Sequence, residues 1–222
     1  MKLTELLLAA VVGAASITVT GAAADAPDAN PADEGLAPVK VKGLDKVYAA
    51  PDADLSGYSK VMLDPVEVSF SKSWHPDSAG QRVTTEDRQR IKDSLAKILR
   101  ERLAKALNDS GRYALVDAPG DGVLRIKADI RDLYINAPDV MSPGISRTYT
   151  LSAGNMRLVA ELRDAPTGAL IARVIDYKSD PDSMRMQWTT SVSNAEAARR
   201  AADDWARILL RQLDAAHGVG KK

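Results

Sequence analysis

Two long amphipathic segments, separated by a stretch that alternates with a period of two, constrain the fold of this chain most. The first segment, residues 85–109, and the second, residues 195–216, both place apolar residues at helical spacing. Between them, residues 123–135 alternate apolar and polar side chains, as does a strand with one buried face. We therefore expect two long helices packed against a sheet.

The ends of both helices are marked by capping residues. Thr84 can cap the first helix with Asp87 three residues later, and Gly111 can end it. Ser193 or Asn194 can cap the second helix, and Gly218 follows its end. The apolar stripe of the first helix is Ile91, Leu95, Ile98, Leu99, Leu103, Ala106 and Leu107, and that of the second is Ala198, Ala201, Ala202, Trp205, Ile208, Leu209 and Leu213.

Six further stretches are predicted as strands, and their order indicates the fold class. They lie at 61–63, 66–70, 113–116, 123–135, 156–163 and 169–177, with a bulge or sheet edge at Pro65 and a hairpin loop at 164–168. In the fourth, Leu124, Ile126, Ala128 and Ile130 should face inward, and Arg125, Lys127, Asp129 and Arg131 outward. The order strand, helix, several strands, helix predicts an α+β fold, a mainly antiparallel sheet with both helices on one face.

The N-terminal residues are typical of a secretory signal peptide. Lys2 precedes a short apolar run that ends in Ala22-Ala23-Ala24, so we expect a signal peptide over 1–24 and a mature chain that begins at Asp25. The alternative is a buried N-terminal helix. After the signal we expect a disordered tether over 25–42, rich in proline and acidic residues, a single α+β domain over 43–217 and a tail over 218–222.

The end of the signal resembles the lipidation motif of bacterial lipoproteins. It reads Val19-Thr20-Gly21-Ala22, where a lipoprotein would have cysteine in place of Ala22. Without a thiol there is no acyl anchor, so we expect a periplasmic or secreted protein that associates with the outer membrane only through a partner. The alternative is that the match is a coincidence of small residues.

The composition excludes several classes of function. Cysteine is absent, so the chain has no disulfide framework, thiolate metal site or cysteine nucleophile. The 30 basic and 30 acidic residues balance, and no aromatic residues interleave with the cationic face of the first helix. We therefore expect no nucleic-acid partner.

No sequence pattern predicts a catalytic, cofactor or metal site. Asp52, Asp54 and Ser56 begin like a calcium loop, but the twelfth place is Leu63 rather than a carboxylate. His75 and His217 do not form a zinc cluster. A hydrolase that uses His75 with Asp64 or Asp77 stays open as an alternative.

A segment between the last hairpin and the second helix is a candidate partner contact. Met184, Met186 and Trp188 combine two adaptable thioethers with an aromatic side chain that is frequent in binding hot spots. The same three residues alternate, so a strand with one face packed on the core is the competing interpretation.

The segment from Tyr48 to Val68 carries a resemblance to a known family. Its residues Tyr48, Pro51, Asp54-Leu55, Tyr58, Val61 and Leu63-Asp64-Pro65-Val66-Glu67-Val68 resemble a bacterial lipoprotein-like family known as domain of unknown function thirty-three thirteen. The resemblance covers about 48–213 and implies a small sandwich similar to the N-terminal domain of TolB and to outer-membrane activators of peptidoglycan synthases. It implies an envelope location in a Gram-negative bacterium, but no reaction and no catalytic residues.

These observations predict an exported cell-envelope protein that acts as a non-enzymatic binding or accessory module. Its expected partner is another envelope protein or a component of the cell wall.

Overall fold

A computed structural model describes residues 34–75, 83–135, 148–150, 154–179, 187–189 and 191–219. Two helices, α1 (Thr85–Ser110) and α2 (Ser191–Ala216), accompany ten strands. The strands are β1 (Ala37–Val39), β2 (Lys46–Ala49), β3 (Lys60–Leu63), β4 (Val68–Phe70), β5 (Ala114–Leu115), β6 (Val123–Ile135), β7 (Thr148–Thr150), β8 (Gly154–Asp164), β9 (Leu170–Ser179) and β10 (Gln187–Thr189).

The main sheet has the order β1-β2-β9-β8-β6-β3-β5, and β4 pairs with β6 beyond β3. The neighbouring strands β1, β2, β9, β8 and β6 are antiparallel to one another in turn. The strands β3 and β4 run parallel to β6, and β5 runs parallel to β3. The α+β class is confirmed, and the sheet is mainly antiparallel as predicted, with shorter parallel pairs between β3 and β6, β4 and β6, and β3 and β5. The parallel pairs arise because α1 connects β4 to β5 and β6, and such a helical crossover returns the chain in the parallel direction.

Pro65, where we expected a bulge or sheet edge, lies between the two strands β3 and β4 that pair with β6. Leu63 of β3 lies opposite Ile126, and Val68 of β4 opposite Ile130, so β3 and β4 follow one another along the same edge of β6. Because proline has no N–H to donate, pairing is interrupted between them.

Both predicted ends of α1 are confirmed. The Thr84 hydroxyl accepts a hydrogen bond from the Asp87 N–H (3.1 Å), and the Asp87 carboxylate accepts one from the Thr84 N–H (3.1 Å), which completes a capping box. Gly111 follows the helix with φ 64°, a left-handed conformation that glycine adopts without strain.

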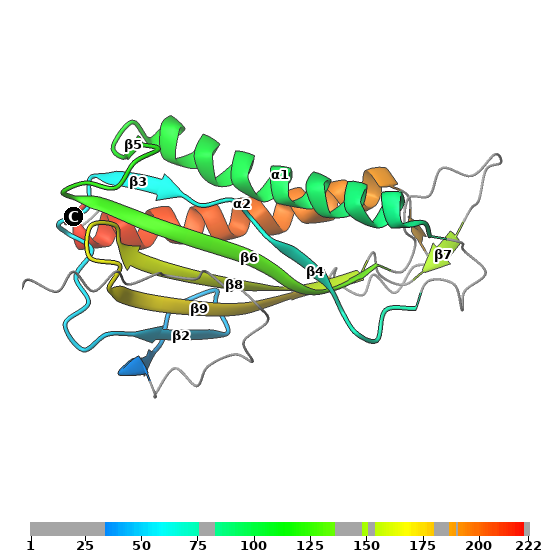
Figure 1. The fold of residues 1–222 in the computed structure, drawn as a ribbon, viewed down its shortest axis with the longest axis horizontal. Coiled ribbons are helices and arrows are strands. Elements are labelled where there is room, and N and C mark those ends of the chain that lie inside the picture. The colour runs from blue at the N-terminus through cyan, green and yellow to red at the C-terminus, as the bar shows by residue number, and fades with distance from the viewer. Residues whose placement is uncertain are drawn as a thin grey trace, which may run out of the picture. The chain divides into compact units, whose positions relative to one another are not determined.

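One hydrophobic core joins both helices to one face of the sheet, along which they run in Figure 1. Leu99 and Leu107 of α1, Leu213 of α2, and Leu124 and Ile130 of β6 are fully buried there. The predicted inward face of β6 is therefore confirmed.

Asp129 faces away from the helices as predicted, and it is buried there because it lies between neighbouring charged side chains of the sheet. Two features of the sequence interpretation need correction. The folded domain begins before residue 43, because β1 lies within the predicted tether and pairs with β2, a strand that we did not predict. Helix α2 begins at Ser191 rather than at Ala195.

Candidate functional site

A cavity of about 500 Å³ lies between the N-terminal halves of α1 and α2 and the adjoining ends of β6, β8 and β9. Pockets of 300–1,000 Å³ are the usual size for small-molecule sites. Its apolar lining is Ile91, Leu95, Ile98, Leu133, Ile135, Met156, Ala195, Ala197, Ala198 and Ala201.

The sequence of α2 explains why the space is there. Towards the cavity the first half of α2 presents alanines, among them Ala198 and Ala201, whereas its second half carries Trp205, Ile208 and Leu213 at buried positions. The large side chains fill the space between helix and sheet, and methyl groups do not. The core is therefore closely packed at the C-terminal end of α2 and open at its N-terminal end.

The sheet side of the cavity depends on an irregular crossing of β6 and β8. Pairing between them shifts register after Arg131, where Asp132 has φ 52°, and resumes at Tyr134 opposite Asn155. Such bulges redirect side chains and are frequent beside binding sites. Gly154 has φ 147°, and a Cβ there would lie 2.0 Å from the carbonyl oxygen of Tyr134, so only glycine fits this part of the wall.

The charged groups among the described residues of the lining are mainly cationic. They include Arg90, Lys178 and Arg200, with Asp204 as the acidic member. Arg90 pairs with Asp87 (Nη2–Oδ1, 2.8 Å), and Lys178 pairs with Asp176 (Nζ–Oδ2, 3.1 Å). Both carboxylates are buried while their cationic partners are partly exposed, so positive charge faces the solvent at these points.

Asp176 connects the cavity region to the core. Its carboxylate accepts hydrogen bonds from the indole N–H of Trp205 (2.7 Å) and from the backbone N–H of Asp45 (2.9 Å). Lys178 is a third partner, so the buried carboxylate of Asp176 has protein groups in place of water around it. This carboxylate therefore ties β9 to α2 and to the segment before β2.

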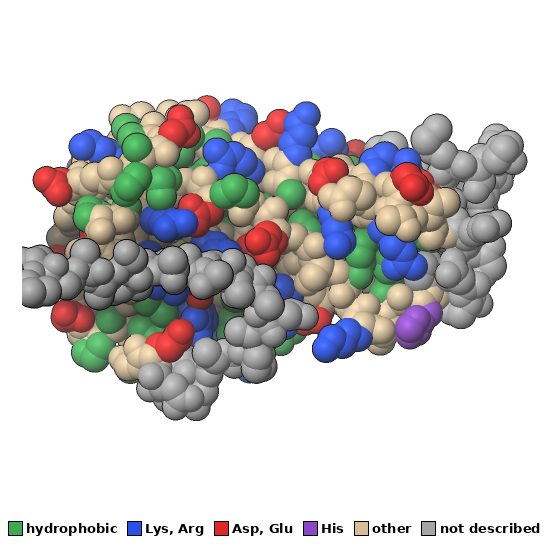
Figure 2. All heavy atoms as spheres, in the orientation of Figure 1, with side chains coloured by type: hydrophobic (Ala, Val, Ile, Leu, Met, Phe, Trp, Pro, Cys, Tyr) green, Lys and Arg blue, Asp and Glu red, His purple; other side chains and the backbone are tan. Residues whose placement is uncertain are grey.

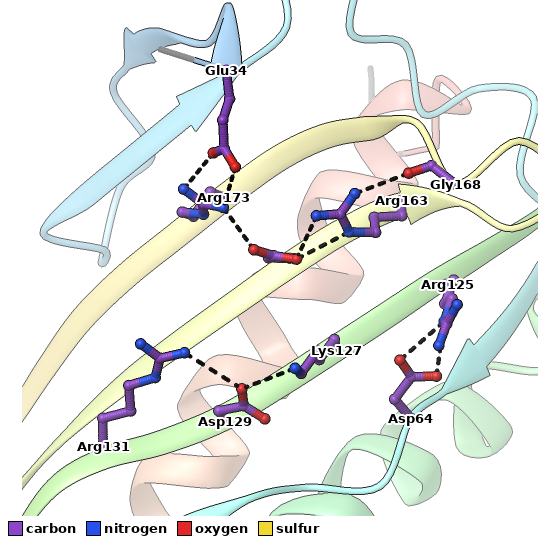
Figure 3. Close-up of polar contacts among 10 residues, drawn as sticks. Glu34, Asp64, Arg125, Lys127, Asp129, Arg131, Arg163, Gly168 and Arg173 are labelled. Carbon is purple, nitrogen blue, oxygen red and sulfur yellow. Dashed lines mark hydrogen bonds and ion pairs between the residues drawn. The ribbon is translucent and has the colours of Figure 1, made fainter. Parts of the chain in front are cut away.

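The opposite face of the sheet carries a second polar cluster, drawn in Figure 3. Arg173 of β9 contacts Glu34 and, through Nη2, the Glu161 carboxylate of β8 (2.7 Å), which also accepts a hydrogen bond from Arg163 (2.8 Å). Burial alone would raise the pKa of Glu161, but the hydrogen bonds from Arg173 and Arg163 outweigh it and hold the pKa below its usual value.

The neighbouring carboxylates on this face are also engaged. Asp129 lies 3.7 Å from Lys127 and 3.9 Å from Arg131, and burial raises the pKa of Asp129 because these cations are too distant to compensate. Asp64 accepts two hydrogen bonds from Arg125 Nε, at 3.0 and 2.9 Å. Figure 2 shows basic and acidic side chains interspersed over the described surface that it draws. The pairing favours a structural role for these charges over a site for a charged ligand.

Of the residues of the hydrolase alternative, the structure describes His75 and Asp64. Asp64 is held by Arg125, and Asp77 lies outside the described residues. His75 is exposed directly after the buried Trp74. Among the described residues no group of three His, Asp or Glu side chains could hold a metal ion. In the segment that begins like a calcium loop, Asp54 accepts hydrogen bonds from the N–H and hydroxyl of Ser56, as in an ordinary turn.

The predicted partner contact is only partly described. Trp188 lies in β10, which pairs antiparallel with β7, so the backbone of this residue is a strand. Its side chain, and the whole of Met184 and Met186, lie outside the described residues. The expected signal peptide lies outside them too. No described helix has the length and apolar character needed to cross a bilayer.

Comparison with known protein families decides the assignment. Residues 27–209 match the family described as protein of unknown function (DUF3313). The chain belongs to this family. The predicted resemblance is thus confirmed, and DUF3313 membership covers nearly the whole of the described α+β domain. No curated protein matches the chain.

Solved structures similar to this DUF3313 protein are distant. A Xanthomonas campestris protein of the DUF330 family is 14% identical, with a TM-score of 0.43 over 77% of this chain and 91% of that one. A minor lipoprotein from Acinetobacter baumannii is 16% identical, with a TM-score of 0.35 over 71% and 94%. PelC from Paraburkholderia phytofirmans is 10% identical, with a TM-score of 0.33 over 71% and 96%.

Sequence reasoning did not find the cavity, although a signal was present. The alanines of α2 were recognised as an apolar stripe, but their small size was not contrasted with Trp205 and Ile208 one and two turns later. A stripe that changes from small to large along one helix predicts a wedge of free space at its small end.

Proposed function

We propose that this DUF3313 protein is an exported, non-enzymatic binding module of the bacterial cell envelope, and that it binds its ligand in the cavity between the two helices and the sheet. The observation that carries the proposal is the cavity itself, about 500 Å³ with mainly apolar walls and a few polar groups at its edge. This combination is typical of a site that binds a molecule, because catalysis also needs converging acid, base or nucleophilic groups.

Two further observations support a binding role. Two carboxylates that could serve as an acid or a base are engaged in structural contacts. Asp176 accepts a hydrogen bond from Trp205, and Asp214 accepts hydrogen bonds from Arg112 and from the hydroxyl of Tyr113 (2.9 Å). The His217 ring lies edge-on to Tyr113, with ring centroids 5.5 Å apart, and its Nδ1 is 2.8 Å from the Leu213 carbonyl. These contacts join the end of α2 to the residues after α1, which a structural role explains.

Binding in the cavity can be tested with a neutral apolar dye, N-phenyl-1-naphthylamine, whose fluorescence rises in apolar surroundings. We expect saturable binding of one dye per purified protein, and loss of binding in Ala198→Leu, whose added side chain occupies the cavity. The matched control is Ala215→Leu on the same helix, outside the lining, which should bind as the wild type does. Equal binding by Ala198→Leu and the wild type would contradict the assignment of the site.

Export is tested separately by expressing the full chain in a Gram-negative host. The apolar run and Ala22-Ala23-Ala24 favour cleavage, so N-terminal sequencing of periplasmic protein should begin at Asp25. Retention of Met1 on periplasmic protein would contradict cleavage. Replacement Ala22→Cys should add a lipid, detected as incorporation of labelled palmitate, if the preceding residues are a lipidation motif.

A further inference from the structure

We infer that the ligand of the cavity is an amphiphile with a single alkyl chain and an anionic head group. The inference rests on the proposed function, because it names the class of molecule that the same site would bind. Two independent properties of the lining lead to it: the way apolar side chains extend from the surface to the core, and the sign of the charges at the edge.

The apolar walls continue from partly exposed to buried residues. Ile91, Ile98 and Met156 remain partly exposed, whereas Leu95, Leu133 and Ala201 behind them are buried. Aliphatic side chains of this kind would be covered in a closely packed core. They instead line a space of about 500 Å³ whose walls run from partly exposed to buried aliphatic side chains, which suits an alkyl chain because each methylene entering it leaves water.

The edge of the cavity presents positive charge although the chain as a whole has a formal net charge of zero. The Arg90 side chain is 41% exposed against 9% for its partner Asp87, and that of Lys178 is 28% exposed against 2% for Asp176. A ligand at the edge therefore meets the cations and not their buried partners.

Arg200 adds a third cation to the lining, and it is exposed. Among the described residues of the lining the acidic side chain is Asp204, which pairs with Arg207 (Oδ1–Nη1, 2.8 Å). An anionic head group complements this edge, and a cationic head group would be repelled by it. Carboxylate and phosphate monoester heads share the required chemistry.

The test is displacement of the neutral dye by soluble amphiphiles below their micelle concentrations. Octanoate, decanoate and dodecanoate should compete with Kd values that fall by about fourfold for each added methylene. Dodecyl phosphate should compete at least as well as dodecanoate, and comparison of the two distinguishes the head groups. Dodecanol should compete with the dye more weakly than dodecanoate does, and dodecyltrimethylammonium should be the weakest competitor.

The contribution of charge is tested with a pair of adjacent substitutions. Arg200→Gln removes a cation of the lining, whereas Arg199→Gln removes a cation that is also exposed but is not part of the lining. We expect Arg200→Gln to raise the Kd for dodecanoate by about two- to fivefold and to leave the Kd for dodecanol unchanged. Arg199→Gln should change neither Kd.

Three outcomes would overturn the inference. Dodecanol or dodecyltrimethylammonium that binds as tightly as dodecanoate would show that charge plays no part, while dye binding would leave the proposed function intact. Affinity that does not rise from octanoate to dodecanoate would show that no alkyl chain enters. Dimerisation of the wild type that is lost in Ala198→Leu, with no amphiphile bound, would assign the cavity to a second copy of the chain.

Discussion

Replacement of Asp176 by alanine is a demanding test of the structure, because this residue is 1% exposed and charged. The substitution leaves the indole N–H of Trp205 and the backbone N–H of Asp45 without their acceptor. A buried donor that loses its partner costs about 1–3 kcal/mol. The ion pair with Lys178 adds little, because that side chain is partly exposed. We therefore expect Asp176→Ala to lower the free energy of unfolding by about 3–5 kcal/mol.

Urea denaturation followed by circular dichroism measures this loss directly. The melting temperature should fall by roughly 10 °C, because each kcal/mol of lost stability lowers it by about 2–4 °C for a chain of this size. Asp109→Asn is the matched control, since it breaks an exposed i,i+4 pair with Lys105 that is worth about 1 kcal/mol or less.

A double-mutant cycle isolates the contact between the carboxylate and the indole. For Asp176→Ala combined with Trp205→Phe, the coupling free energy should be about 1.5–3 kcal/mol, as for a hydrogen bond to a charged group. A loss in Asp176→Ala no larger than in Asp109→Asn, or a coupling free energy near zero, would refute the contact.

Three further predictions follow from the core, the cavity wall and the charged face of the sheet. Leu99→Ala should cost about 2–5 kcal/mol in urea unfolding because Leu99 is fully buried, whereas the exposed Lys97→Ala should change little; equal effects would show that Leu99 is not core. Gly154→Ala should cost at least about 1–3 kcal/mol, measured as a lower melting temperature, because the new Cβ would meet the Tyr134 carbonyl and the φ of 147° disfavours alanine. Because the pKa of Glu161 is lowered in the folded state, its contribution to stability is present above the unfolded pKa and is lost as pH falls through the folded pKa. Because the pKa of Asp129 is raised in the folded state, protonation of Asp129 increases the free energy of unfolding as pH falls. From pH 7 to pH 3, Glu161→Gln should therefore lose less stability than the wild type and Asp129→Asn more, and the reverse order would contradict these directions.

The elements with strong periodicity were predictable from the sequence. The period-two pattern of residues 123–135 marks the full length of β6, and the Thr84–Asp87 capping box marks the start of α1. These signals are local: a capping box needs only four consecutive residues, and a half-buried strand alternates whatever its neighbours are.

What the sequence did not predict depends on contacts between distant residues. The strand β2 is four residues long and forms by pairing with β9, more than a hundred residues later. The parallel direction of β3 and β4 follows from the crossover through α1 and not from their own residues. Likewise the cavity arises where α2, α1 and three strand ends meet, so a single alanine in the sequence does not reveal it.

The central claim is that a ligand occupies the cavity between the helices and the sheet. Isotope-edited nuclear Overhauser spectroscopy of the purified, labelled protein with unlabelled dodecanoate tests it most directly. We expect contacts from the alkyl chain to the methyl groups of Ile91, Ile98 and Met156, which line the cavity. Contacts confined to side chains of the opposite sheet face, such as Ile175, or none at all with saturating dodecanoate, would contradict it.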